Sequence, residues 1–120
     1  MRSRLVSLSA LTAVAAAAAV AAHASSAPVG PLPAGPTATL ATKAGELVAV
    51  ALPHRTGRSW RIARAFDPAV LRQVSEADVG SNVVLVFKTV QPGRTTLAFA
   101  LTRGETAKAY EARRFRVHVR

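Results

Sequence analysis

Apolar and polar residues alternate along much of this chain, and this alternation is its strongest structural signal. Val48, Val50 and Leu52 are spaced by two residues, as are Leu85 and Phe87. A period of two places successive side chains on opposite faces of a strand, so such segments are typical of half-buried β-strands. The pattern predicts strands at about 37–43, 47–52, 59–66, 71–75, 83–90, 95–102 and 108–118.

The connections between these segments are short and carry turn residues. Gln91-Pro92-Gly93-Arg94 places proline and glycine where a type II turn needs them, so we expect segments 83–90 and 95–102 to form a hairpin. Val84 and Val86 are also apolar, which predicts that segment 83–90 is a central strand with both faces partly covered.

Seven short strands with regular turns predict an all-β fold, an immunoglobulin-like antiparallel β-sandwich. Between the third and fourth strands, Asp67 and Pro68 suit the N-cap and first position of a single helical turn. The chain contains no cysteine, which excludes a disulfide framework and an acylated lipoprotein. We therefore expect the hydrophobic core alone to stabilise the fold.

The last predicted strand has an apolar face and a basic face. Phe115, Val117 and Val119 alternate with the basic residues Arg114, Arg116, His118 and Arg120. We interpret this basic cluster, which Arg113 extends, as the solvated face of an edge strand, where charge prevents aggregation between strands. Nucleic-acid binding is the alternative. It needs exposed aromatic rings, and only Tyr110 is expected to be free to stack.

The N-terminal part predicts export. A basic start, a continuous run of small and apolar residues and the cleavage pattern Ala22-His23-Ala24 predict a secretory signal peptide over 1–24. An uncleaved membrane anchor is the alternative, although alanine is only weakly apolar for a stable span. The proline-rich segment 25–36 is expected to be an extended linker, and 37–120 a single small domain.

The composition of the chain is strongly basic. The formal net charge of +10 falls to +8 when Arg2 and Arg4 leave with the signal peptide. Such an excess indicates attraction to an acidic partner or surface.

Catalytic chemistry finds little support in the residues. After signal cleavage the histidines are His54 and His118, which lie far apart in the sequence, and the carboxylates are scattered. We interpret these histidines as solvated residues rather than metal ligands. No cysteine and no Gly-x-Ser-x-Gly elbow supplies a nucleophile. We therefore expect no enzyme, no metal and no cofactor.

A family resemblance begins at residue 45. Gly45-Glu46 opens an alternating strand that ends at Leu52, and Thr56-Gly57-Arg58-Ser59-Trp60 follows. This order resembles the chagasin family of cysteine-protease inhibitors, in which Asn-Pro-Thr-Thr-Gly-Tyr-x-Trp follows such a strand. The glycine-containing segment 79–82, the Pro-Gly turn and the closing segment 115–119 also fit the family. The resemblance covers nearly all of the domain from about Thr37.

The resemblance implies three loops that fill the active-site cleft of a papain-like protease without reacting. The loop at 53–59 would lie nearest the catalytic cysteine, and the loops at 79–82 and 102–106 would grip the cleft on either side. The protease-binding residues that it implies are His54, Arg55, Thr56, Gly57, Arg58, Gly80, Ser81, Asn82, Arg103, Gly104 and Glu105.

The loops also depart from the family pattern. Arg58 occupies the tyrosine position, Ser81 and Asn82 stand where more glycine is usual, and Gly104-Glu105 replaces a proline and an aromatic residue. The missing aromatic residue removes an expected anchor of the interface. Arg55 and Arg58 would carry charge into the cleft, which is costly unless an acidic group meets it.

From these observations we expect an exported monomer, periplasmic or secreted, that inhibits a papain-like cysteine protease. No nucleic-acid partner is expected, nor a stable membrane span after signal cleavage. The alternative is a binding or structural module of the cell envelope. It would have the same fold and no inhibitory surface, and would use its arginine-rich face on anionic partners.

Overall fold

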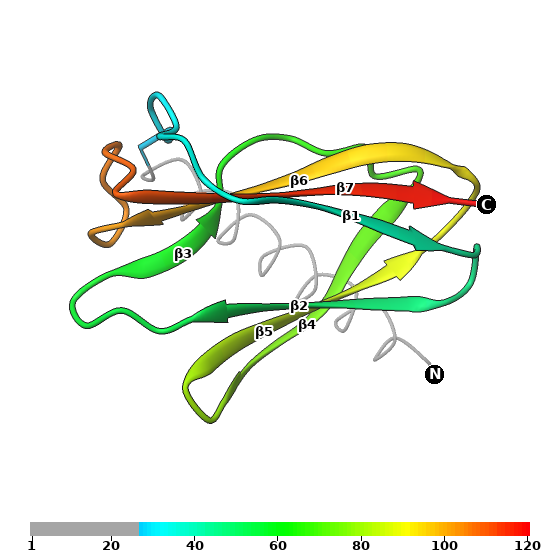
Figure 1. Cartoon of the computed structure of the whole chain (residues 1–120), viewed down its shortest axis with the longest axis horizontal. Coiled ribbons are helices and arrows are strands. Elements are labelled where there is room, and N and C mark those ends of the chain that lie inside the picture. Colours follow the sequence, from blue (N-terminus) through cyan, green and yellow to red (C-terminus); the bar gives the residue numbers. More distant parts are fainter. Residues whose placement is uncertain (1–26) are drawn as a thin grey trace, which may run out of the picture.

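The computed structural model describes residues 27–120, which form seven strands and no helix. The strands are β1 (Thr37–Thr42), β2 (Leu47–Pro53), β3 (Ser59–Ile62), β4 (Leu71–Val79), β5 (Asn82–Thr89), β6 (Gly93–Thr102) and β7 (Glu111–Val119). They build a four-stranded sheet of order β1-β7-β6-β3 and a three-stranded sheet of order β2-β5-β4, which face each other (Figure 1). The predicted β-sandwich of about seven strands is confirmed.

One pair departs from the antiparallel arrangement. β1 runs parallel to β7, with Thr37 opposite Arg114 and Thr42 opposite Val119. The remaining pairs, β2 with β5, β4 with β5, β3 with β6 and β6 with β7, are antiparallel.

The core lies between the two sheets and follows the predicted alternation. Val50 and Leu52 of β2 and Leu85 and Phe87 of β5 are buried. The other buried members are Val70, Leu71, Leu97, Phe99, Val117 and Val119. A chain of ring contacts joins Phe66 to Phe87, Phe87 to Phe99 and Phe99 to Phe115, with centroids 5.7, 6.4 and 5.8 Å apart. Aromatic pairs at this spacing add to the energy of burial.

The expected hairpin between segments 83–90 and 95–102 is wrong. The Pro-Gly turn connects β5 of one sheet to β6 of the other, so the two strands are not paired. A Cβ atom at Gly93 would lie 2.7 Å from Cγ2 of Val70, so this crossing needs a residue without a side chain. The proline and glycine residues indicate that the chain bends here, but they do not indicate which sheet the next strand joins. β5 is nevertheless the central strand that its apolar residues predicted.

The interpretation of the basic cluster as the face of an edge strand is also wrong. β7 lies between β1 and β6, so its backbone hydrogen-bonding groups have partners on both sides. Protection of an edge therefore does not account for the basic residues of β7.

Several strand ends differ from the predictions. β3 ends at Ile62 rather than at the predicted residue 66, because the following residues cross to β4 in the other sheet. Phe66 lies in this crossing and packs against the core. At Asp67 the chain makes the predicted turn: the Leu71 N–H donates to the Asp67 carbonyl, and the Asp67 carboxylate accepts from the Ala69 N–H. β4 continues to Val79, past a register shift between Gln73 and Ser75.

The described part of segment 25–36 forms no strand and is held against the domain. The Gly30 N–H donates to the Ala107 carbonyl (2.8 Å), and the Arg114 N–H donates to the Pro36 carbonyl (3.1 Å). The expected signal peptide over 1–24 lies outside the described residues. Within 27–120 we find no helix of sufficient length and hydrophobicity to cross a membrane.

Candidate functional site

The three loops singled out by the sequence meet at one end of the sandwich, on the left in Figure 1. The first loop, residues 54–58, connects β2 to β3. The second is the Gly80–Ser81 turn between β4 and β5, and the third, residues 103–110, connects β6 to β7. The His54 N–H donates to the Ser81 carbonyl at 2.9 Å, and Ser59 lies opposite Thr102. The first contact joins the first loop directly to the second, and the second joins the start of β3 to the end of β6, where the third loop begins.

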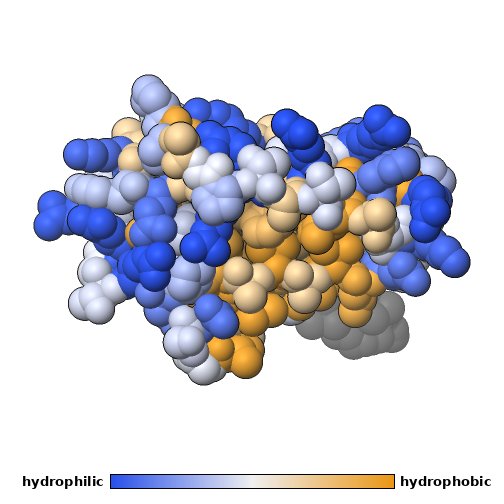
Figure 2. Space-filling view, viewed as in Figure 1, coloured by the Kyte–Doolittle hydropathy of each residue, from blue (hydrophilic) through white to orange (hydrophobic). Residues whose placement is uncertain are grey.

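The surface around the three loops is largely hydrophilic. Hydrophilic residues gather at both ends of the molecule in this view, whereas hydrophobic residues gather between them, over and beside β2 (Figure 2). All eleven sequence-predicted site residues lie on these loops or on the first residue of β5, and all but Asn82 are exposed.

The first loop is a tight turn that projects into solvent. Arg55 and Arg58 form a β-bridge, and the Arg58 N–H donates to the Arg55 carbonyl at 3.2 Å. Gly57 has φ 73°, a left-handed conformation that favours glycine, and no atom lies within 4 Å of the position of its missing Cβ. Thr56 and Gly57 therefore form the tip.

Trp60 braces the base of this loop. Its ring packs against the core, as the sequence indicated, and its Nε1 donates to the carbonyl of Pro53 at 2.7 Å. This hydrogen bond joins the residue before the first loop to the second residue after it. The loop is therefore held closed at its base by a side chain that is itself fixed by packing.

The two arginines of the first loop have partners within the chain. Arg55 Nε lies 2.7 Å from Glu111 Oε2, and Arg55 Nη2 lies 3.2 Å from Glu111 Oε1. This bidentate contact lowers the pKa of Glu111 below its ordinary value and raises the pKa of Arg55, in both cases mainly through the hydrogen bond. An acidic group thus meets Arg55, which reduces the cost expected for its charge.

Arg58 stacks on Tyr110. Its guanidinium carbon lies 3.7 Å from the ring centroid, and Lys108 Nζ lies 4.9 Å from the same centroid. Tyr110, the aromatic residue that the sequence left free for nucleic-acid stacking, is therefore covered by cations of its own chain.

The second loop is a two-residue hairpin turn. Gly80 occupies its first position with φ 61°, as hairpin turns of this length require. Asn82, expected in the loop, is the first residue of β5 and is half-buried opposite Val79 and Pro53. Below the turn, Asp78 Oδ1 lies 3.2 Å from His54 Nε2, a second contact between this hairpin and the first loop.

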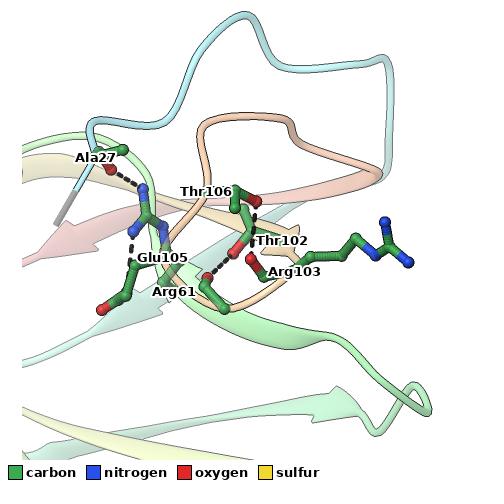
Figure 3. Close-up of polar contacts among 7 residues, drawn as sticks. Ala27, Arg61, Thr102, Arg103, Glu105 and Thr106 are labelled. Carbon is green, nitrogen blue, oxygen red and sulfur yellow. Dashed lines mark hydrogen bonds and ion pairs between the residues drawn. The ribbon is translucent and has the colours of Figure 1, made fainter.

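The third loop is shaped by its own hydroxyl groups. Thr102 Oγ1 donates to the Gly104 carbonyl (2.6 Å), and Thr106 Oγ1 donates to the Arg103 carbonyl (2.8 Å) (Figure 3). Gly104 has φ 54°. Residues 108–110, expected to begin the last strand, belong to this loop, because β7 starts at Glu111.

The side chains of the third loop point in different directions. Arg61 of β3 pairs with Glu105 at 3.1 Å and also donates to the Ala27 carbonyl, so this loop is joined to β3 and to the N-terminal segment. Arg103 extends away from the other labelled residues in Figure 3. Arg103 is thus presented to solvent, whereas the exposed Glu105 is engaged by Arg61 of β3.

Glu111, Asp78 and Arg61 are residues of this end that the sequence does not assign to the site, and Tyr110 stood out in the sequence only as a ring free for stacking. Arg55 and Glu111 are 56 positions apart, and only the pairing of β6 with β7 brings Glu111 to the loop end. Among residues 27–120, no group of three or more His, Cys, Asp or Glu side chains could hold a metal ion.

Comparison with solved structures shows that this sandwich has the fold of a cysteine protease inhibitor. It is similar to the cysteine protease inhibitor EhICP2 from Entamoeba histolytica, with a TM-score of 0.53 and 15% identity over 71% of this chain and 96% of that chain. It also matches PbICP-C in complex with falcipain-2, with a TM-score of 0.47 and 13% identity over 78% of this chain and 95% of that chain. No protein-family model and no curated protein matches the chain. The resemblance expected from the sequence is thus confirmed for the fold.

Proposed function

We propose that this protein is an exported inhibitor of papain-like cysteine proteases, which blocks the active-site cleft non-covalently with its three loops. The observation that carries the proposal is the convergence of the loops at residues 54–58, 80–81 and 103–106 at one end of the sandwich. The fold shared with EhICP2 supports it.

The physical basis is a wedge that is already formed before binding. Each loop has a glycine in the left-handed region at or near its tip, and strand pairing or side-chain hydrogen bonds hold each loop at its base. A preformed loop loses little conformational entropy on docking, so a modest contact area can still give tight binding.

The roles within the wedge follow from exposure. We assign Thr56 and Gly57, at the open tip of the first loop, to the position nearest the catalytic cysteine. Gly80 and Ser81 would contact one wall of the cleft, and Arg103 the other. Since no group of the protein attacks the enzyme, inhibition would be reversible.

Titration of papain with the purified protein tests the proposal. Gly57→Trp would place a bulky side chain at the tip and prevent its close approach to the enzyme, so we expect it to weaken inhibition by at least about 100-fold. Gly45→Trp is the matched control. Gly45 also has a left-handed φ, 93°, with open space around it, but lies in the β1–β2 turn at the opposite end.

Both substitutions strain the backbone in the same way, so only their positions differ. The proposal predicts that the protein and Gly45→Trp inhibit and that Gly57→Trp does not. Equal inhibition by both variants would show that the first loop does not contact the protease. Failure of the unaltered protein against several papain-like enzymes would favour the non-inhibitory envelope module.

A further inference from the structure

The outer face of the four-stranded sheet carries a basic hollow, far from the three loops. Its volume is about 470 Å³, and it is lined chiefly by Arg94, Arg116, His118, Thr39 and Thr96. Arg94 is near the start of β6 and His118 near the end of β7, at the right-hand end in Figure 1, whereas the loops lie at the left.

Strand register places these side chains in two rows on one face. Arg94 lies opposite His118, and Arg116 is flanked by Thr39 of β1 and Thr96 of β6. Because residues spaced by two share a face of a sheet, Arg116 and His118 point to the same side, away from the buried Val117. The hollow therefore presents arginine, histidine and threonine side chains from three adjacent strands.

The positive charge of this hollow is not compensated within the described chain. No carboxylate lines it, and neither Arg94 nor Arg116 makes an ion pair or side-chain hydrogen bond with any of residues 27–120. Arg114 lies farther along the same face and differs from these two arginines, because its Nη2 donates to the Pro33 carbonyl oxygen at 3.2 Å. Since β7 is a central strand, charge is not needed here to protect an edge.

We propose that this hollow binds an acidic polysaccharide. Sulfate or carboxylate groups of the polymer would pair with Arg94 and Arg116, and its neutral hydroxyls would hydrogen-bond with Thr39 and Thr96. The site would act independently of protease inhibition, and binding there would leave the loop end accessible.

The lining favours a polysaccharide over other polyanions. Single-stranded nucleic acid is bound on exposed aromatic rings, and no aromatic residue lines the hollow. Firm binding of a protein to a membrane surface usually adds apolar side chains that insert between lipids to the attraction between charges. The large exposed apolar residues of the described chain, Leu47, Val74, Val79 and Val90, all lie outside the hollow.

The test measures binding of the purified protein to heparin, the probe, at physiological salt. Replacing both arginines (Arg94→Gln with Arg116→Gln) should weaken binding by about 100-fold, at roughly tenfold for each arginine–anion pair that is removed. The control is Arg72→Gln with Lys88→Gln. These two exposed residues lie opposite each other on the other sheet, and their replacement changes the net charge equally. We expect the control to weaken binding by less than about threefold, as general charge attraction would give.

Both double variants should remain folded, because all four replaced side chains are exposed. Thermal melting of each variant checks this. If both double variants bind heparin equally weakly, or if the unaltered protein does not bind heparin, the proposal that the hollow binds an acidic polysaccharide is wrong. Binding of a single-stranded oligonucleotide or of anionic phospholipid vesicles as tight as that of heparin would overturn the choice of polysaccharide.

Discussion

Arg55 and Arg58 show how single residues adapt the loop end to its unusual sequence. Both put positive charge into the first loop, and each is held by a partner from the region around the start of β7: Arg55 by Glu111 and Arg58 by Tyr110. The charge is therefore fixed in place rather than free to sample many positions. This orders side chains that would otherwise lose conformational entropy on binding.

The Arg55–Glu111 pair predicts a pH dependence of stability. A carboxyl group whose pKa is lowered by folding stabilises the folded state above its ordinary pKa, and this contribution is lost as the pH falls through the lowered value. Glu111→Gln should lower the melting temperature at neutral pH by less than about 5 °C, because the pair is partly exposed. The difference from the unaltered protein should begin to shrink as the pH falls below the ordinary pKa of 4.5, and should disappear once the pH lies below the lowered pKa of Glu111.

Melting curves of the two proteins across this pH range provide the measurement. Glu76→Gln serves as the control, because it removes the same charge from an exposed position on β4, where the carboxylate accepts a hydrogen bond from Gln73 and forms no ion pair with any of residues 27–120. A difference that persists unchanged into acid would show that Glu111 acts by other means than its charge.

At the scale of elements, the third loop depends on the N-terminal segment. Arg61 joins Glu105 of this loop to the Ala27 carbonyl, and the Gly30 N–H donates to the Ala107 carbonyl. The segment expected to be a linker therefore supports one part of the candidate site.

Arg61→Met should release both partners while keeping the packing of the side-chain stem. We expect the backbone amides of Val29, Gly30 and residues 104–107 to exchange with deuterium about tenfold faster, since local opening becomes easier. Amides of the second loop should not change. Arg72→Met, on the other sheet, is the control. Unchanged exchange at 104–107 would show that the third loop is stable without this support.

The existence of the strands could be predicted from the sequence, but their partners could not. Alternation identifies a strand because burial acts on single residues, so β2, β5 and β6 were found within a few positions of their ends. Pairing depends on contacts between distant segments, which is why the Pro-Gly turn was assigned to a hairpin and β7 to an edge. β4 was predicted too short because its second half, through Asp78, is exposed.

At the scale of the whole molecule, the candidate site arises from the meeting of three loops that are far apart in the sequence. The motif around Thr56 and Gly57 located the first loop, and chain order located the other two. The contacts that hold the loops together, such as His54 with Ser81 and Arg55 with Glu111, follow from the packing of two sheets and have no local signal.

We propose that this end of the molecule enters the cleft of a papain-like protease and blocks its catalytic cysteine without reacting. Alkylation of that cysteine in papain by iodoacetamide, with and without an equimolar amount of the protein, tests this most directly. We predict that alkylation slows by at least about tenfold, and that the protein is recovered with its mass unchanged. Alkylation at the unprotected rate would show that the protein does not cover the cysteine, and recovery of the protein cleaved between residues 53 and 59 would show that it is a substrate of the enzyme.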